Sequence, residues 1–317
     1  MKKVNSKIKI VFLGTPEFGA IILRKLAKTN YKPVLAITSS DKPKGRKRTL
    51  TPPPVKLIAQ KYNIPIWQTD KISSLKPQIS KLRPDLIIVA SYGQIIPKEV
   101  LKIPKYRSLN VHPSLLPRWR GPSPIQFTIL KGDKKTGVTI ILMDEKIDHG
   151  PIIAQEELEI KNPKINYLEL HDQLANLGAD LLIKTIPDWI SGKIKTKEQS
   201  KKGITYSKIL EKEDGKIDWR KSAEEIERQI RAFYPWPGTY TEIENGKPKL
   251  LKILKADVLP IKTKKKKGEI FVYNEKITVQ TGKNCLILEK LQLEGKKPIN
   301  SDDFLRGHRD IIGSILK

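Results

Sequence analysis

The sequence predicts an α/β fold in two domains: an open, mostly parallel sheet flanked by helices, followed by a small β-barrel. Short apolar runs alternate with helical patterns over the first half of the chain, which is typical of βα units. Roughly the last hundred residues instead hold several short strand-like segments in succession, as small barrels do. The length of 317 residues is enough for two domains that each have a core.

The N-terminal half carries the pattern of a Rossmann-like sheet. Its clearest strand, Asp85–Ala90, is apolar from its second residue onwards, which suits a central strand covered on both faces. A helix is expected to begin after Pro52-Pro53-Pro54. The other expected strands are Ile8–Gly14, Val34–Thr38, Ser108–His112 and Val138–Met143, and the expected helices are Glu17–Lys28, Val55–Tyr62 and Leu168–Ile190.

The C-terminal half follows a segment rich in Lys, Gly, Ser and Thr, residues 191–207, which we interpret as a linker. A helical pattern over Ala223–Phe233 ends at Tyr234-Pro235-Trp236-Pro237-Gly238. We therefore expect a first domain at 1–190, the linker at 191–207 and an OB-like β-barrel domain at 208–317. The expected barrel strands are Thr239–Ile243, Leu250–Val258, Glu269–Phe271, Ile277–Thr281 and Cys285–Leu293.

Composition and charge restrict the partners. Mean hydropathy is −0.41 and no apolar run approaches the roughly 18 residues of a membrane span, so we expect no membrane partner. The single cysteine, Cys285, fits a reducing cytoplasm. The formal net charge of +27 favours a polyanion such as RNA, although a general richness in Lys and Ile also raises it. A Gly/Pro loop concentrates cations at Lys42, Lys44, Arg46, Lys47 and Arg48, which strengthens the RNA interpretation.

Side chains suited to catalysis follow two of the expected strands. Asn110 and His112 lie two residues apart on an extended segment, so their side chains leave the same face. Asp148 follows the strand Val138–Met143. Ligands bind outside the carboxyl ends of the strands in open α/β sheets, where we expect these residues to meet Ser91-Tyr92-Gly93. An amide, an imidazole and a carboxylate can stabilise an oxyanion and move a proton; the alternative is a strand end whose polar groups are simply satisfied.

Other well-known motifs are missing from the sequence. The segment after the first strand, Gly14-Thr15-Pro16-Glu17-Phe18-Gly19, does not have the spacing of a dinucleotide-binding fingerprint, and there is no P-loop. Four scattered histidines and one cysteine show no metal-ligand spacing. We therefore expect catalysis without a metal.

Beyond these arguments from single residues, the chain resembles the folate-dependent formyltransferases. The signature is Asn110-Val111-His112-Pro113-Ser114-Leu115-Leu116-Pro117 together with Asp148. Four further segments, Val11–Phe18, Gly45-Arg46, Pro117–Pro122 and Arg231–Gly238, are similar to the methionyl-tRNA formyltransferase family within that superfamily. The resemblance extends from Ile8 into the C-terminal region and includes both expected domains.

The resemblance implies formyl transfer from 10-formyltetrahydrofolate, a co-substrate, to the α-amino group of methionine on initiator tRNA. We expect a cytoplasmic protein and take a monomer as the default. Asn110 and His112 are then expected to polarise the formyl oxygen, and Asp148 to hold His112 and help take the amine proton. The resemblance places the folate against Tyr92, Gly93, Gln94, Ile95, Ile96, Pro97, Ser114, Leu115, Leu116, Pro117, Met143 and Asp144. It places the tRNA against Lys42, Lys44, Arg46, Lys47, Arg48, Arg118 and Arg120, with the C-terminal barrel along the acceptor arm.

Two departures from the family pattern and three alternatives stay open. Pro113 stands where members often have glycine, and His149 puts an extra titratable group beside Asp148. A glycinamide ribonucleotide formyltransferase is disfavoured, because Pro16 lacks an N–H and Glu17 would repel a phosphate. A sugar-nucleotide N-formyltransferase shares the three residues but needs less positive charge. A non-catalytic RNA-binding protein on the same scaffold would not need all three.

Overall fold

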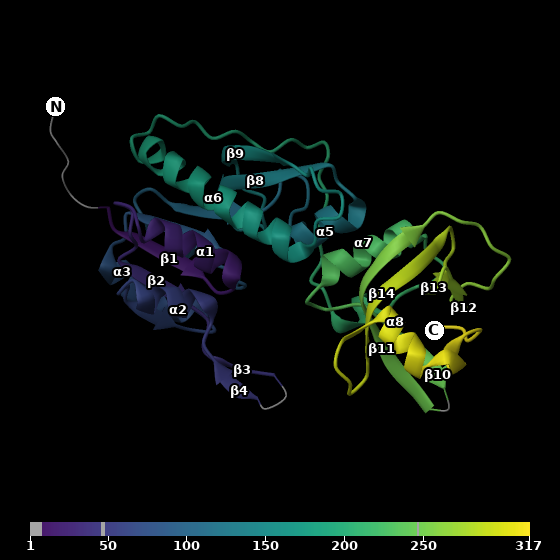
Figure 1. Ribbon diagram of the computed structural model, residues 1–317. Coiled ribbons are helices and arrows are strands. Elements are labelled where there is room, and N and C mark those ends of the chain that lie inside the picture. The colour runs from purple at the N-terminus through teal and green to yellow at the C-terminus, as the bar shows by residue number, and fades with distance from the viewer. Residues whose placement is uncertain (1–7, 46–47, 246) are drawn as a thin grey trace. The chain divides into compact units, whose positions relative to one another are not determined.

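The computed structural model describes residues 8–45, 48–245 and 247–317, and the chain divides into two compact units (Figure 1). Unit 1 comprises Met1–Pro124, Lys135–Ile160 and Leu170–Lys208. Unit 2 comprises Ile125–Lys134, Lys161–Glu169 and Ile209–Lys317. Two short segments of the N-terminal half therefore pack with the C-terminal residues, and the expected domain limits at 190 and 208 stay a prediction beside this division.

Unit 1 is built on a seven-stranded sheet in the order β5-β2-β1-β6-β7-β8-β9. Neighbouring strands from β5 to β7 are parallel, whereas β8 and β9 turn back antiparallel. The expected open, mostly parallel sheet is confirmed; β5 and β9 are not among the expected strands, because β5 is very short and β9 is rich in Glu. The bounds are β1 (Ile10–Gly14), β2 (Leu35–Thr38), β5 (Ile66–Gln68), β6 (Leu86–Ala90), β7 (Ser108–His112), β8 (Lys135–Leu142) and β9 (Ile152–Glu159).

Helices cover both faces of this sheet. On one face Leu13 of β1 belongs to a buried cluster with Ile79 and Val100, which come from α3 and α4. On the other face α6 lies so close to β7 that a Cβ on Gly178 would be 2.8 Å from Val111 Cγ1. No helix of the described residues is both long and apolar enough to cross a membrane. The bounds are α1 (Glu17–Leu26), α2 (Pro54–Lys61), η1 (Ile72–Leu75), α3 (Lys76–Leu82), α4 (Lys98–Leu101) and α6 (Tyr167–Ile190). Helix α5 (Pro124–Lys131) belongs to unit 2 from Ile125 onwards.

The basic loop is a short hairpin rather than an irregular loop. Strand β3 (Lys42–Lys44) pairs antiparallel with β4 (Thr49–Thr51), and the hairpin extends away from the sheet (Figure 1). Lys42, Lys44 and Thr49 are exposed on it. Arg46 and Lys47 lie outside the described residues. The hairpin therefore presents its described lysines to solvent.

Unit 2 contains a six-stranded antiparallel sheet in the order β10-β11-β14-β13-β12, with β15 paired to β14. Helices α7 and α8 pack into its core through Ile226, Ile230 and Phe304. This sheet confirms the expected C-terminal β domain. The bounds are η2 (Lys212–Gly215), α7 (Ala223–Phe233), β10 (Tyr240–Asn245), β11 (Lys247–Leu259), β12 (Ile270–Tyr273), β13 (Lys276–Gln280), β14 (Cys285–Leu293), β15 (Ile299–Asn300), α8 (Ser301–Gly307) and η3 (Arg309–Ile311).

The last residues of the chain connect the two edges of the unit 2 sheet. On the β10 side, Glu242 N donates to Lys317 O at 2.8 Å and Lys317 N donates to Glu242 O at 3.0 Å. On the β12 side, Ile270 N donates to Ser314 O at 2.9 Å. Leu316, between these contacts, is 3% exposed and belongs to the core. The C-terminal segment thus closes the sheet into a small barrel.

Candidate active site

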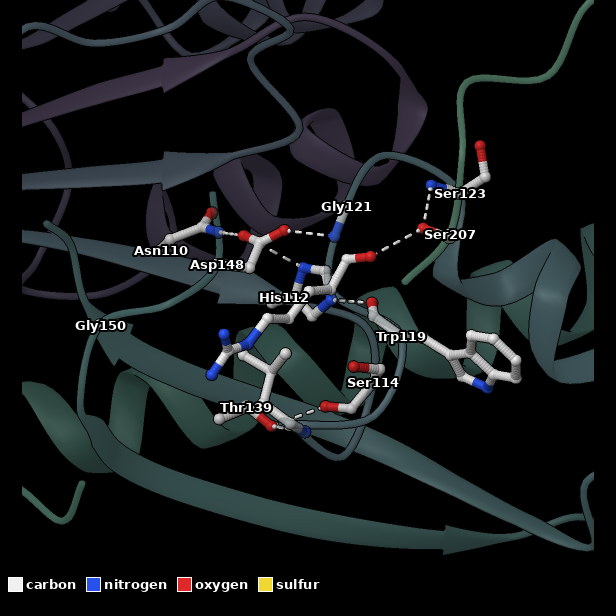
Figure 2. A network of polar contacts seen from close by, with 12 residues as sticks. Asn110, His112, Ser114, Trp119, Gly121, Ser123, Thr139, Asp148, Gly150 and Ser207 are labelled. Atoms are coloured by element: carbon white, nitrogen blue, oxygen red, sulfur yellow. Dashed lines mark hydrogen bonds and ion pairs between the residues drawn. The ribbon is translucent and has the colours of Figure 1, made fainter. Parts of the chain in front are cut away.

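One strand and one loop bring the candidate catalytic side chains together (Figure 2). Strand β7 carries Asn110 and His112 on one face, and the loop after β8 carries Asp148. Asn110 Nδ2 donates to Asp148 Oδ1 at 3.1 Å, and His112 Nδ1 lies 3.5 Å from the same oxygen. The side chains of His112 and Asp148 are only 5% and 13% exposed. One oxygen of Asp148 therefore accepts from Asn110 and lies at ion-pair distance from the imidazole of His112, in a largely desolvated place.

Asp148 reaches this place by a different route from the one the sequence predicts. Strand β8 runs antiparallel to β7 and pairs Leu142 with Leu109, so its carboxyl end lies beside the amino end of β7. The expectation that the carboxyl ends of these two strands meet at one edge of the sheet therefore does not hold. The loop after β8 instead turns back, and Asp148 has a φ of +47°, a left-handed conformation that few residues except glycine adopt. The position of its carboxylate thus depends on the loop backbone.

Backbone groups of the loop after β7 complete the polar network (Figure 2). Gly121 N donates to Asp148 Oδ2 at 2.9 Å. His112 Nε2 lies 2.9 Å from the carbonyl oxygen of Trp119. A carbonyl only accepts, so Nε2 is the nitrogen that donates there, and Nδ1 is left facing Asp148. The network therefore orients both the imidazole and the carboxylate.

The first segment expected to bind folate, residues 92–97, is partly buried. Tyr92 and Ile96 pack in one core cluster with Met143 beside them, and burial raises the pKa of the Tyr92 hydroxyl. The side chain of Gln94 binds the backbone of Thr69 and Ile72, at 2.9 and 2.8 Å. Gly93 and Ile95 are exposed, and Pro97 directly precedes α4. The structure brings segments 92–97 and 143–144 together, and within the first it leaves Gly93 and Ile95 most accessible.

The second such segment, residues 114–117, is held by β8. Thr139 Oγ1 donates to Ser114 O at 2.6 Å and accepts from Leu116 N at 3.1 Å. Gln155 Nε2 donates to the same hydroxyl at 2.8 Å. Leu115 and Pro117 are partly exposed next to these buried neighbours.

The loop after β8 contains both Asp144 and His149. His149 Nδ1 lies 2.6 Å from Asp144 Oδ2, so the histidine that departs from the family pattern has a partner inside that loop.

The residues expected to bind tRNA have different surroundings. Lys42 and Lys44 are exposed on the hairpin, Arg48 follows its turn, and the Arg118 guanidinium lies 4.4 Å from the centre of the Trp119 ring. Arg120 is only 5% exposed and donates through Nε and Nη2 to the Gln199 Oε1 atom, at 3.1 and 2.8 Å. The assignment of Arg120 to tRNA stays a prediction, and in the structure its guanidinium binds another residue of the protein, Gln199.

Sequence reasoning missed several groups that hold the site. Thr139 and Gln155 fix the 114–117 loop. The Trp119 carbonyl orients His112, and the Gly121 N–H orients Asp148. The side chain of Gln199 donates to the backbone carbonyl of Asp148. Backbone groups leave no trace in residue type. Gln199 stands in a lysine-rich segment that has the composition of a linker, so the sequence offers no signal for it.

Comparison with known proteins decides which family the chain belongs to. A family model described as formyl transferase matches residues 8–186, and one described as formyl transferase, C-terminal domain, matches residues 209–309. The methionyl-tRNA formyltransferase of Bacillus velezensis is 43% identical over 313 residues, 97% of each chain. That of a Sulfurihydrogenibium species is 41% identical over 307 residues, 95% of this chain and 97% of the relative. The chain belongs to the methionyl-tRNA formyltransferase family.

The chain also shares its fold with solved structures of lower sequence identity. HypX from Aquifex aeolicus, in complex with tetrahydrofolic acid, is 18% identical with a TM-score of 0.62; the match covers 95% of this chain and 47% of HypX. This chain thus spans about half the length of HypX. An N-formyltransferase from Helicobacter canadensis, in complex with folinic acid and dTDP-3-aminofucose, is 20% identical with a TM-score of 0.65. The match covers 89% of this chain and 98% of the Helicobacter protein. At such identities these likenesses show the fold alone.

Proposed function

We propose that this member of the family transfers the formyl group of 10-formyltetrahydrofolate to the α-amino group of methionine on initiator tRNA. The convergence of Asn110 Nδ2 and His112 Nδ1 on a single oxygen, Asp148 Oδ1, carries the proposal. Asn110 Nδ2, and His112 Nδ1 when the imidazole is protonated, are donors in a desolvated place and suit the negative charge that a formyl oxygen gains when an amine attacks. The names of the 41–43% identical relatives supply methionyl-tRNA as the acceptor.

The chemistry assigns one role to each of the three side chains. Asn110 and His112 hold the formyl oxygen, and Asp148 takes the proton that the attacking amine loses, directly or through a water. A bond forms between the amine nitrogen and the formyl carbon, and the bond from that carbon to folate N10 breaks. The proton released by the amine is the one that N10 needs on leaving: Asp148 passes it to His112 Nδ1, which lies 3.5 Å away, and the imidazole gives it to N10.

The residues around the three side chains suit folate and tRNA. Ile95 and Ile147 are 79% and 63% exposed on the loops after β6 and β8, and an apolar ring system needs such surface next to backbone partners. We propose that residues 92–97, 114–117 and 143–144 bind the folate. We also propose that initiator tRNA meets the hairpin at 42–48 together with Arg118 and Arg120, and that the enzyme is a cytoplasmic monomer.

A formylation assay with the purified chain tests the proposal. 10-Formyltetrahydrofolate is offered with charged initiator methionyl-tRNA, and in parallel with a nucleotide-linked amino sugar. We expect transfer to the tRNA, and His112→Ala should lower kcat by a factor of about 10² or more with an unchanged melting temperature. Transfer only to the sugar would overturn the acceptor, and a near-normal rate for His112→Ala would overturn the role of the imidazole.

A further inference from the structure

Residues 197–207, which have the composition of a linker, bind both loops of the active site. Lys197 and Ile152 exchange backbone hydrogen bonds of 2.7 and 2.8 Å, next to the loop that carries Asp148. At the other end, Arg120 N donates to Thr205 O at 2.9 Å and Ser207 N donates to Arg120 O at 2.7 Å. We name residues 197–207 the strap. It connects the loop that orients His112 with the loop that presents Asp148.

Gln199 lies in the strap at the point where the two loops meet. Its Nε2 donates to the carbonyl oxygens of Asp148 and Gly150, both at 2.8 Å. Its Oε1 accepts from Nε and Nη2 of Arg120, at 3.1 and 2.8 Å. Both amide hydrogens and the amide oxygen are thus engaged, and Arg120 is a buried cation for which this oxygen is a partner.

We propose that Gln199 is a positioning residue that holds Asp148 in its left-handed backbone conformation; this inference rests on the proposed function of Asp148. The Asp148 carbonyl belongs to the peptide unit between Asp148 and His149, and the Gly150 carbonyl to the unit after Gly150. The Gln199 amide therefore fixes how the peptide unit directly after Asp148 is turned. A φ of +47° is unfavourable for a residue with a Cβ and persists where surrounding contacts determine it. Without these bonds the carboxylate leaves the geometry in which it meets Asn110 and His112.

Two substitutions separate the donor from the acceptor side of the amide. Gln199→Met has a similar length and makes no hydrogen bonds, whereas Gln199→Glu still accepts from Arg120 but cannot donate to the two carbonyls. We expect both to lower kcat at least about tenfold, since displacement of a catalytic group by 1 Å costs about 10² in rate. The KM for 10-formyltetrahydrofolate should stay within about twofold, because Gln199 bonds Arg120, Asp148 and Gly150 rather than the segments proposed to bind folate.

The matched control is Ser200→Ala, the next residue of the strap, whose hydroxyl accepts from Lys202 N at 3.0 Å. It should leave kcat unchanged. Normal kcat in Gln199→Met, or restored kcat in Gln199→Glu, would overturn the inference, since in the second case the Arg120 contact alone is sufficient. Melting temperatures of all variants show that the rates refer to folded protein.

A double-mutant cycle with Asp148→Asn decides whether Gln199 acts through Asp148. In that background Gln199→Met should lower kcat no further, because residues that act as a unit give non-additive effects. Two independent, multiplying losses would overturn the inference. A near-normal rate for Asp148→Asn alone would instead overturn the proposed function of Asp148, so the two failures are distinguishable.

Discussion

At the scale of single residues, backbone groups hold the active site as much as side chains do. The Trp119 carbonyl fixes His112, and the Trp119 N–H in turn donates to Thr205 Oγ1 at 2.9 Å. The Gly121 N–H fixes Asp148. A Cβ on Gly121 would lie 2.4 Å from the carbonyl oxygen of Ser207, so only glycine lets this loop come so close to the strap. Each proposed catalytic side chain is therefore oriented by loops that the strap contacts.

A different residue, Asp218 of unit 2, links stability to pH. Its carboxylate accepts hydrogen bonds from the side chain of Arg220, at 2.8 and 3.0 Å, and from the backbone N–H of Arg220, at 3.0 Å. These bonds, the side-chain ones most, lower the pKa of Asp218 to about 2. A folded pKa below the unfolded value of 3.8 gives stability that is complete above that value and is lost as pH falls towards 2. In Asp218→Asn we expect the urea midpoint to fall less between pH of about 4 and 2 than in the parent.

The control for this prediction removes the partner instead. Arg220 is 81% exposed, so Arg220→Ala leaves the core intact and returns most of the Asp218 pKa shift. Its urea midpoint should follow the same shallower pH dependence as Asp218→Asn. Identical slopes in the parent and both variants would show that the ion pair forms equally in the unfolded chain.

Residue types revealed the candidate catalytic side chains but not their supports. Asn110 and His112 share a face because a strand alternates, and this is visible in the spacing alone. Gln199 and Arg120 meet across 79 residues of sequence, and only the folded loops bring them together. An arginine beside the catalytic motif in a chain of charge +27 predicts an RNA contact; the structure buries Arg120 and gives it a partner within the protein as well.

At the scale of elements, apolar continuity was enough for the central strands and too little for the edges. All five residues of β6 are buried, as its unbroken apolar run predicts. At the edge, β9 alternates more exposed residues with partly buried ones and carries little apolar signal. The residue types of β8 also do not reveal its direction, because a strand inside a sheet buries the same apolar side chains whether it runs parallel or antiparallel to its neighbour.

The hairpin β3–β4 is the element whose charge has a testable consequence. Arg46, outside the described residues, is replaced in Arg46→Ala. If the hairpin contacts phosphates, the KM for methionyl-tRNA rises, and the plot of log(kcat/KM) against log[salt] becomes shallower by about one unit. The KM for folate should not change. The control without a charge change is Leu50→Ala, since Leu50 is an apolar residue of the same hairpin and is 67% exposed. Equal salt slopes in Arg46→Ala and the parent would show that the hairpin makes no phosphate contact.

At the scale of the whole molecule, unit 2 gathers segments that are distant in sequence. Arg231 of α7 bonds the carbonyl of Ile165 at 2.6 Å while its guanidinium pairs with the buried Glu227 at 2.7 and 3.0 Å. Arg228 donates to the carbonyl of Leu130 at 3.0 Å. Segments 125–134 and 161–169 are held to unit 2 by these arginines of one helix. Sequence composition changes only once, near residue 191, and so gives no sign of these earlier crossings.

The C-terminal segment gives unit 2 its last strand-like contacts, and one substitution measures what that closure contributes. Leu316 is 3% exposed in the core, whereas its neighbour Ile315 is 41% exposed. Leu316→Ala should lower the free energy of unfolding of unit 2 by about 2–5 kcal/mol, the usual cost of deleting a buried leucine side chain. Ile315→Ala, the matched control, should cost less than about 1 kcal/mol. Urea unfolding with amide exchange read over β10 and β12 measures both. Because the C-terminal segment bonds both edges of the sheet, Leu316→Ala should speed amide exchange in both strands. If Leu316→Ala lowers the free energy of unfolding no more than Ile315→Ala does, the sheet is stable without this closure.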